Sequence, residues 1–232
     1  MARRMLRLKG AMSTLASSPT AIRSPAIAVQ NTLLACGIAS SLVYVVANVV
    51  AGLAWPGYSF AAQTISELSA IDAPSRSVWL PFGFAYDILL VAFGIGVWRA
   101  AGTRRGLRIA AVMLLAIGAV GAPWPPMHMR GVATSLTDTL HVVWASMISV
   151  FILITVASAS TAGPRWFRIA SLASLAGLFV FGGLTFHYAP ELAGNRPTPW
   201  LGLVERVNLG IYLLWVSLLA CRLLRDRSTR LG

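Results

Sequence analysis

The sequence predicts an all-α fold, a six-transmembrane-helix bundle with both termini in the cytoplasm. The 232-residue chain is 57% hydrophobic and only 11% charged, whereas a soluble domain carries roughly 25% charged residues. Apolar stretches of about 20 residues, long enough to cross a bilayer as a helix, recur along the chain. The basic residues also alternate between successive loops, in the pattern that sets the orientation of such helices.

Six apolar segments are candidate membrane spans, joined by connections too short for a soluble domain. They cover residues 32–55, 78–98, 107–124, 139–159, 166–186 and 200–224. The third is the shortest, and Arg108 at its inner end can reach the interface with its long side chain. We therefore predict a basic, flexible cytoplasmic tail over residues 1–28, one transmembrane domain over 29–225 and a short cytoplasmic tail over 226–232.

The net charge of +12 is distributed unevenly between the two sides of the predicted bundle. Most of the 19 Lys and Arg residues lie in the two tails or in the loops 99–106 and 160–165 and the adjoining helix starts. The opposite loops hold only Arg76, Arg130 and Arg196. Because loop Lys and Arg mark the cytoplasmic side, the basic charge indicates topology, and we expect no nucleic-acid partner. Arginine strongly outnumbers lysine, which indicates a high-GC bacterial genome and hence the bacterial plasma (inner) membrane.

Helix-start signals occur in the loops opposite to the basic ones. "TISE", from Thr64 to Glu67, and "SLTD", from Ser135 to Asp138, both fit the capping box, in which two orphan N–H groups are satisfied reciprocally. Small and polar residues in the first span also follow one helical stripe, which we expect to face the bundle interior. The stripe consists of Gly37, Ser41, Tyr44, Asn48 and Gly52.

Polar residues gather in the outer half of the predicted bundle, and we interpret them as a candidate pocket. Its members are Asp87, His141, Glu205, Arg206, Glu67, Asn208 and Tyr212. Asp87 lies about 13 Å into its span, where a charge costs on the order of 2.5–3.5 kcal/mol and requires a partner. Arg206 lies at a compatible depth, so we predict an ion pair between the two.

The three histidines, His128, His141 and His187, are all on this same side. Asp138 is one turn before His141, so the pair suits either an oriented base or metal ligand, or a structural hydrogen bond. The histidines have irregular spacings and form no HxxxH pair. We therefore expect no cofactor, and we keep a zinc ion held by these histidines as the alternative.

Three passages resemble the membrane-protein family catalogued as domain of unknown function 998. They are "ISELSAIDAPSR" followed by "WLPFGFAYDILL", then "TDTLHVVWASM", and finally "GLVERVNLGIYLLWVSLLACRLL". The resemblance implies a six-helix bundle, with Ser66, Glu67, His141, Glu205 and Arg206 at signature positions. It implies no assigned activity.

Three functions fit these observations. The first, which we favour, is a non-enzymatic bundle in the lipid bilayer whose outward-facing pocket binds a lipid headgroup, a small polar ligand or a partner protein. The second is a zinc-dependent intramembrane lipid hydrolase, an amidase or esterase. The third is a small transporter with Asp87 as its proton or ion site, although no internal repeat supports it.

Overall fold

The computed structural model describes residues 25–121 and 125–231, and these residues fold as helices joined by loops. The elements are α2 (Pro25–Leu53), the 3-10 helix η2 (Ser66–Ser69), α3 (Arg76–Ala101), α4 (Arg105–Ala119), α5 (Leu136–Ser160), α6 (Arg165–His187), α7 (Ala189–Ala193) and α8 (Leu201–Leu231). The all-α prediction is confirmed. The residues before Pro25, which include most of the predicted tail, lie outside the described part.

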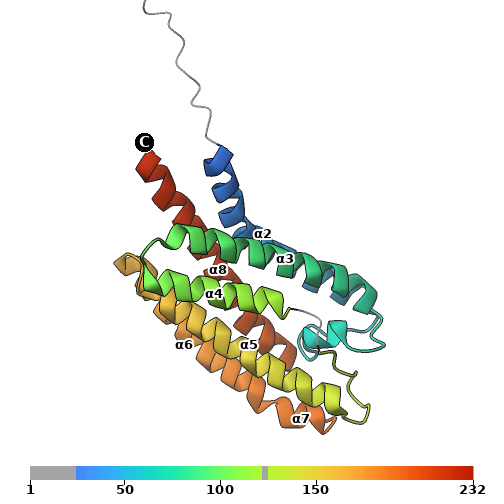
Figure 1. The fold of residues 1–232 in the computed structure, drawn as a ribbon. Helices are drawn as coiled ribbons and strands as arrows, with labels where there is room; N and C mark the ends of the chain where they lie inside the picture. Colours follow the sequence, from blue (N-terminus) through green and yellow to red (C-terminus); the bar gives the residue numbers. More distant parts are fainter. Residues whose placement is uncertain (1–24, 122–124, 232) are drawn as a thin grey trace, which may run out of the picture.

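The long helices form a closed ring, and Figure 1 shows several of them side by side. Each of α2, α3, α4, α5 and α6 packs against the next along the chain, α6 packs against α8, and α8 returns to α2. Antiparallel neighbours joined by short loops account for this order. The core of the ring is filled by large side chains such as Phe93, Leu114 and Trp215, each almost fully buried.

Five helices in the described residues are long and apolar enough to cross a membrane: α2, α3, α5, α6 with the short α7, and α8. The helix α4 has 15 residues, which gives about 22 Å and falls short of a bilayer core of about 30 Å. Within the predicted span 107–124, the regular helix ends at Ala119. Pro123, Pro125 and Pro126 follow closely in the sequence, and a residue that precedes proline disfavours the helical conformation.

Close packing between α2 and α3 depends on glycine. A Cβ atom on Gly37 would lie 2.8 Å from the ring of Phe93, and one on Gly96 would lie 3.0 Å from the backbone of Leu33. Small residues allow helix backbones to approach in lipid, where no hydrophobic force draws helices together. The predicted stripe on α2 faces inward, since four members are buried and Tyr44 is half-buried between Trp79 and Tyr86.

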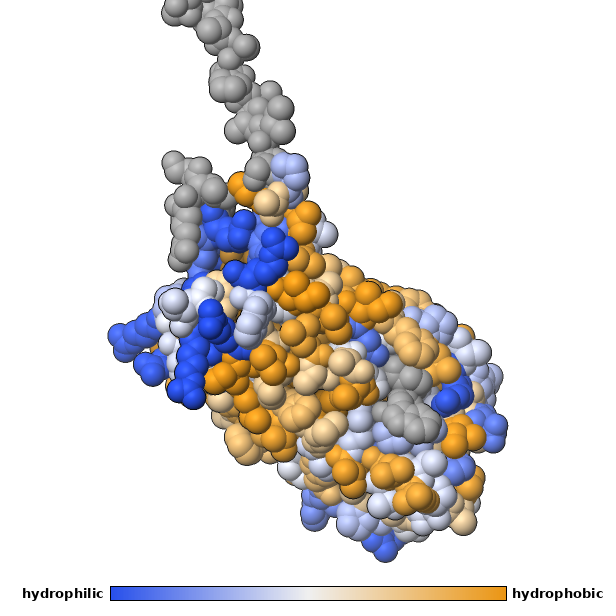
Figure 2. Space-filling view, viewed as in Figure 1, coloured by the Kyte–Doolittle hydropathy of each residue, from blue (hydrophilic) through white to orange (hydrophobic). Residues whose placement is uncertain are grey.

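The loops meet at two opposite ends of the ring. At one end, Arg222 of α8 donates to the carbonyl oxygen of Ala162 in the α5–α6 loop, 2.5 Å away. Gly106, at the start of α4, approaches Ser158 near the end of α5. The hydrophilic side chains of this end stand out in Figure 2 against the apolar flank of the bundle. The basic loops predicted to share one side therefore do so.

The other three loops build a cap at the opposite end. The segment 54–75 docks on α8, where Leu203 N donates to Ala61 O at 3.0 Å. It also contacts the loop before α5, since Ile71 N donates to Met127 O at 2.7 Å. The reciprocal bonds of both predicted capping boxes are present: Thr64 and Glu67 exchange them around the start of η2, one residue before its N-cap Ile65, and Ser135 and Asp138 do so at the start of α5.

Candidate functional site

A buried ion pair holds the cap together. Glu67 is 1% exposed and receives two hydrogen bonds from Arg130, from Nε at 2.6 Å and from Nη2 at 2.8 Å. The backbone N–H and hydroxyl of Thr64 also donate to Glu67, and Arg130 Nη1 donates to Thr198 at 3.1 Å. The hydrogen bonds to Glu67 raise the pKa of Arg130. Planar bidentate pairing of this kind is geometrically specific, so it joins three loops in one arrangement.

The first turns of α8 carry the second polar group of the cap. Glu205 accepts the backbone N–H of Ile65 at 2.6 Å, which ties η2 to α8. Its neighbour Arg206 points to the other side of the helix, toward α2. Because adjacent helix residues project about 100° apart, the two side chains serve different partners.

Arg206 is surrounded by uncharged acceptors. Its guanidinium donates to the carbonyl oxygens of Phe60, Gln63 and Gly202, to the side-chain oxygen of Asn48, and to the hydroxyl of Tyr58. Its carbon Cζ also lies over the rings of Phe60, at 5.1 Å, and Tyr58, at 5.5 Å. The sequence predicted Asp87 as the partner of Arg206, and the structure puts these cap residues and Asn48 in its place.

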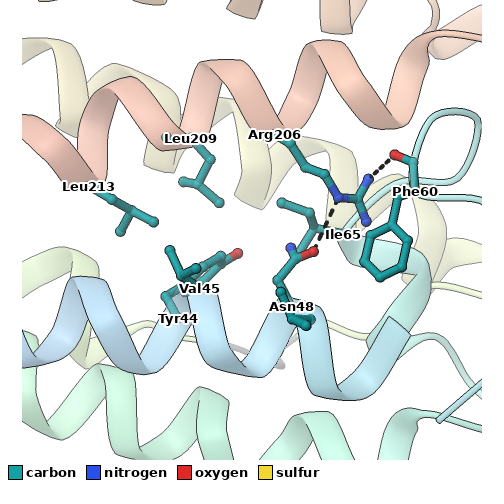
Figure 3. Close-up of a pocket in the computed structure, with 10 residues that line it drawn as sticks. Tyr44, Val45, Asn48, Phe60, Ile65, Arg206, Leu209 and Leu213 are labelled. Carbon is teal, nitrogen blue, oxygen red and sulfur yellow. Dashed lines mark hydrogen bonds between the residues drawn. The ribbon is translucent and has the colours of Figure 1, made fainter. Parts of the chain in front are cut away.

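A cavity of about 240 Å³ opens directly below Arg206, between α2 and α8 (Figure 3). Its walls are mostly apolar. The lining residues are Tyr44, Val45, Asn48, Val49, Phe60, Ile65, Arg206, Leu209, Gly210 and Leu213. Val45 and Val49 are each about half exposed on the outside of the ring. The cavity therefore has one cationic end at the cap and a hydrocarbon flank that faces the surroundings of the bundle.

Tyr58 lies beside Arg206 in the cap and supports this end of the cavity. Its hydroxyl donates to Thr64 O at 2.6 Å and accepts from Arg206 Nη2 at 2.5 Å. Burial raises the pKa of Tyr58 to about 12, and the adjacent guanidinium opposes that rise. The phenol is therefore neutral at physiological pH and does not neutralise Arg206.

Asp87 lies in the middle of α3, where it is 7% exposed and faces the end of α4. A Cβ atom on Gly121 would collide with the Asp87 carboxylate, and one on Gly118 would lie 2.9 Å from the Asp87 carbonyl oxygen. The aspartate thus faces the bundle interior, as predicted, but against α4. Glycine at position 121 is what allows the carboxylate to sit against this backbone.

The histidines have separate surroundings. Asp138 accepts the backbone N–H of His128 at 2.7 Å and contacts its Nδ1 at 3.0 Å, so His128 replaces His141 as its partner. His141 Nδ1 lies 2.8 Å from the carbonyl oxygen of Pro125. His187 ends α6 beside Tyr188. Within the ranges 25–121 and 125–231, no three His, Cys, Asp or Glu side chains gather as a metal site would require.

The remaining candidates, Asn208 and Tyr212, face a different cavity, between α5, α6 and α8. The seven residues predicted for one pocket are thus divided among the cap, the contact between α3 and the end of α4, and two cavities. Sequence reasoning missed Arg130, Tyr58 and Thr198 as parts of the cap. The sequence did contain a signal for Arg130. Only three basic residues lie in the loops on the side of Glu67, so Arg130 was one of few possible partners for that acid.

The apolar helices and the ring architecture define a polytopic helical membrane protein. Residues 38–222 match the family model described as "Protein of unknown function (DUF998)", and the chain belongs to this family. The resemblance seen in the sequence is thereby confirmed. Comparison with curated proteins and with solved structures gives no match.

Proposed function

We propose that this membrane protein binds an anionic amphiphile, with its acidic group at Arg206 and its hydrocarbon chain in the cavity between α2 and α8. One observation carries the proposal: the hydrogen-bond acceptors of Arg206 among the described residues are all uncharged, and the neighbouring carboxylate of Glu205 accepts the N–H of Ile65 instead. A cation in a low-dielectric site is stabilised by an anion far more than by neutral dipoles. Among the described residues Arg206 Nη2 donates only to Tyr58, which leaves one of its two N–H groups for that contact.

The shape of the cavity supports the same ligand class. Val45 and Leu213 continue away from the guanidinium along the apolar flank (Figure 3), as a hydrocarbon chain follows its headgroup. The volume of about 240 Å³ is below the range of roughly 300–1,000 Å³ of drug-sized pockets. We therefore expect it to hold the headgroup junction and the first part of a chain, with the rest in the bilayer.

Ligand-dependent stabilisation tests this proposal. A ligand that binds only the folded state raises the melting temperature, and the rise grows with the logarithm of the ligand concentration above its Kd. The purified full chain, in mixed micelles, should be stabilised by phosphatidylglycerol or by laurate and not by phosphatidylcholine. A response to laurate alone would identify a carboxylate ligand, and a response to phosphatidylglycerol alone would identify a phosphodiester. If the wild-type protein responds equally to phosphatidylglycerol and phosphatidylcholine and does not respond to laurate, the proposal is contradicted.

Arg206→Gln should abolish the response, and Arg196→Gln is the matched control. Both variants remove one positive charge from the same end of the bundle. Arg196 is exposed and paired with Glu191, so its loss should leave the response unchanged. If both variants respond like the wild type, Arg206 is not the anchor.

We further propose that all six long helices cross a bacterial inner membrane, with both termini in the cytoplasm. The clustering of basic loops at one end of the ring supports this orientation. The chain from the start of α4 to Met127 also leads from the basic end to the cap, because Met127 bonds to Ile71. The 15 residues of α4 would thus begin a crossing that ends at the cap, where Met127 lies.

The lipid hydrolase and the transporter stay predictions. For the hydrolase, purified protein should carry about one zinc per chain that His141→Ala removes. For the transporter, Asp87→Asn should fold and lose a transport activity. Neither the separate surroundings of the histidines nor the packing of Asp87 against Gly121 favours these functions over amphiphile binding.

A further inference from the structure

A second cavity, of about 380 Å³, lies on the other side of α8. Its walls come from α5, α6 and α8, and the residues that matter here are Ser149, Val150, Phe179, Gly183, Asn208 and Tyr212. A Cβ atom on Gly183 would meet nothing within 4 Å, so α6 leaves open space there. Val150 and Phe179 are also exposed on the outside of the ring, by 51% and 65%. The cavity therefore communicates with the hydrocarbon that surrounds the bundle.

Two buried polar atoms on residues that line this cavity lack hydrogen bonds. They are the hydroxyl oxygen of Tyr212, whose side chain is 1% exposed, and Oδ1 of Asn208. Among the described residues neither atom has a partner. Buried polar groups are nearly always satisfied, and water is scarce at this depth, roughly 10–17 Å along α8 from its first residue. A ligand in the cavity would supply the missing partners.

The chemistry of the two atoms defines that ligand. Asn208 Oδ1 accepts a hydrogen bond, and the Tyr212 hydroxyl can donate one. A single hydroxyl or amide group meets both needs, because each contains a donor and an acceptor. The lining residues of this cavity are all uncharged, so a charged group would be buried there without a counter-ion, which is strongly unfavourable.

We propose that the cavity between α5, α6 and α8 binds a neutral amphiphile from the bilayer, an apolar chain that carries a hydroxyl or an amide. Its polar group lies between Asn208 and Tyr212, and its chain follows the apolar wall past Val150 and Phe179. This site is separate from the Arg206 cavity, and it differs in ligand charge. The protein would thus hold two classes of membrane amphiphile on opposite sides of α8.

Photolabelling of the full chain in phosphatidylcholine nanodiscs tests this site. The probes are a diazirine-bearing hexadecanol, the corresponding hexadecanamide, and the methyl ether of the alcohol. The methyl ether keeps an acceptor for Tyr212 and has no donor for Asn208. The alcohol and the amide should label α5 and α6 peptides that include Val150 or Phe179, with the ether about fivefold weaker, as expected for one lost hydrogen bond. Equal labelling by all three probes would overturn the proposal.

Two conservative variants provide an independent measure. Tyr212→Phe and Asn208→Leu each remove one polar group and preserve most of the side-chain volume, so each should lower labelling by the alcohol about fivefold. Tyr44→Phe removes a hydroxyl from the Arg206 cavity instead and should change nothing. Arg206→Gln should likewise leave alcohol labelling intact, which separates failure of this site from failure of the anionic one. Wild-type labelling in both Tyr212→Phe and Asn208→Leu would mean that chains fill the cavity without recognition.

Discussion

Glu67 shows how this chain keeps a carboxylate almost completely inside a small cap. The four hydrogen bonds that it accepts from Arg130 and Thr64 replace the water that it loses. Such an arrangement is weak evidence for net stability, but it is strongly sensitive to the loss of one partner. The pair therefore fixes how the cap loops are joined above the Arg206 cavity.

Glu67→Gln should destabilise the protein by about 3 kcal/mol, the lower part of the range for a broken buried pair. The lower part applies because the Arg130 side chain is 25% exposed and keeps some solvation. Denaturant unfolding of the purified protein in detergent measures the change. The control is Glu191→Gln, which breaks the exposed pair with Arg196 and should have little effect. Equal losses in the two variants would show that the buried pair has no special role.

Tyr58 makes the stability of the cap dependent on pH. Its pKa in the folded protein is about 12, and an unfolded tyrosine ionises near pH 10. Because the folded state holds the proton more tightly, the stabilisation is complete below about pH 10 and is lost as the pH rises to about 12. The stability difference between the wild type and Tyr58→Phe should shrink across that interval. Melting curves at increasing pH measure it, and a constant difference would exclude the effect.

At the scale of the elements, the predictions from local sequence were the accurate ones. Both capping boxes and the inward stripe on α2 depend on residues three or four apart, and helix geometry fixes their relation. The end of α4 was predicted less well, because apolar composition continues beyond Ala119 while the prolines that follow stop the helix. Hydropathy reports burial in lipid and does not by itself report backbone conformation.

The α2–α3 interface should be intolerant of any side chain at Gly37. Gly37→Ala brings a methyl group to 2.8 Å from the Phe93 ring, and overpacking of this kind costs about 1–3 kcal/mol. Gly210→Ala is the control, since nothing lies within 4 Å of a Cβ atom there and alanine favours the helix by up to about 1 kcal/mol. Melting temperatures should therefore fall for the first variant and hold or rise for the second. A rise for Gly37→Ala would contradict the packing.

At the scale of the whole molecule, the ring order explains why Asp87 and Arg206 do not pair. Their depths along α3 and α8 are similar, but depth does not say which helices are neighbours. In the ring, α2 lies between α3 and α8 on the side where Arg206 points. The joining of the cap loops was equally inaccessible to sequence reasoning, because the contacts between the loops join residues far apart in the chain, such as Glu67 and Arg130, which are 63 positions apart. Long-range contacts of this kind leave no periodic pattern.

Cysteine accessibility tests the orientation of the whole bundle. After replacement of Cys36 and Cys221, Thr134→Cys and Asn195→Cys should react in intact cells with a membrane-impermeant thiol reagent. Thr103→Cys and Thr161→Cys should react only after lysis. All four positions are exposed, so differences report the side of the membrane rather than burial. The reverse pattern would put the cap and Arg206 in the cytoplasm.

The central claim is that Arg206 and the apolar cavity below it recognise an anionic amphiphile, and site-mapped photolabelling tests it most directly. Phosphatidylglycerol and phosphatidylcholine with the same diazirine-bearing chains would be incorporated separately into nanodiscs with the full chain. We predict that phosphatidylglycerol labels α2 and α8 peptides around Val45, Val49 and Leu213, and that Arg206→Gln reduces this labelling about tenfold, as expected for one lost charge-assisted hydrogen bond. Labelling of these peptides that is equal for the two lipids and unchanged in Arg206→Gln would contradict the account.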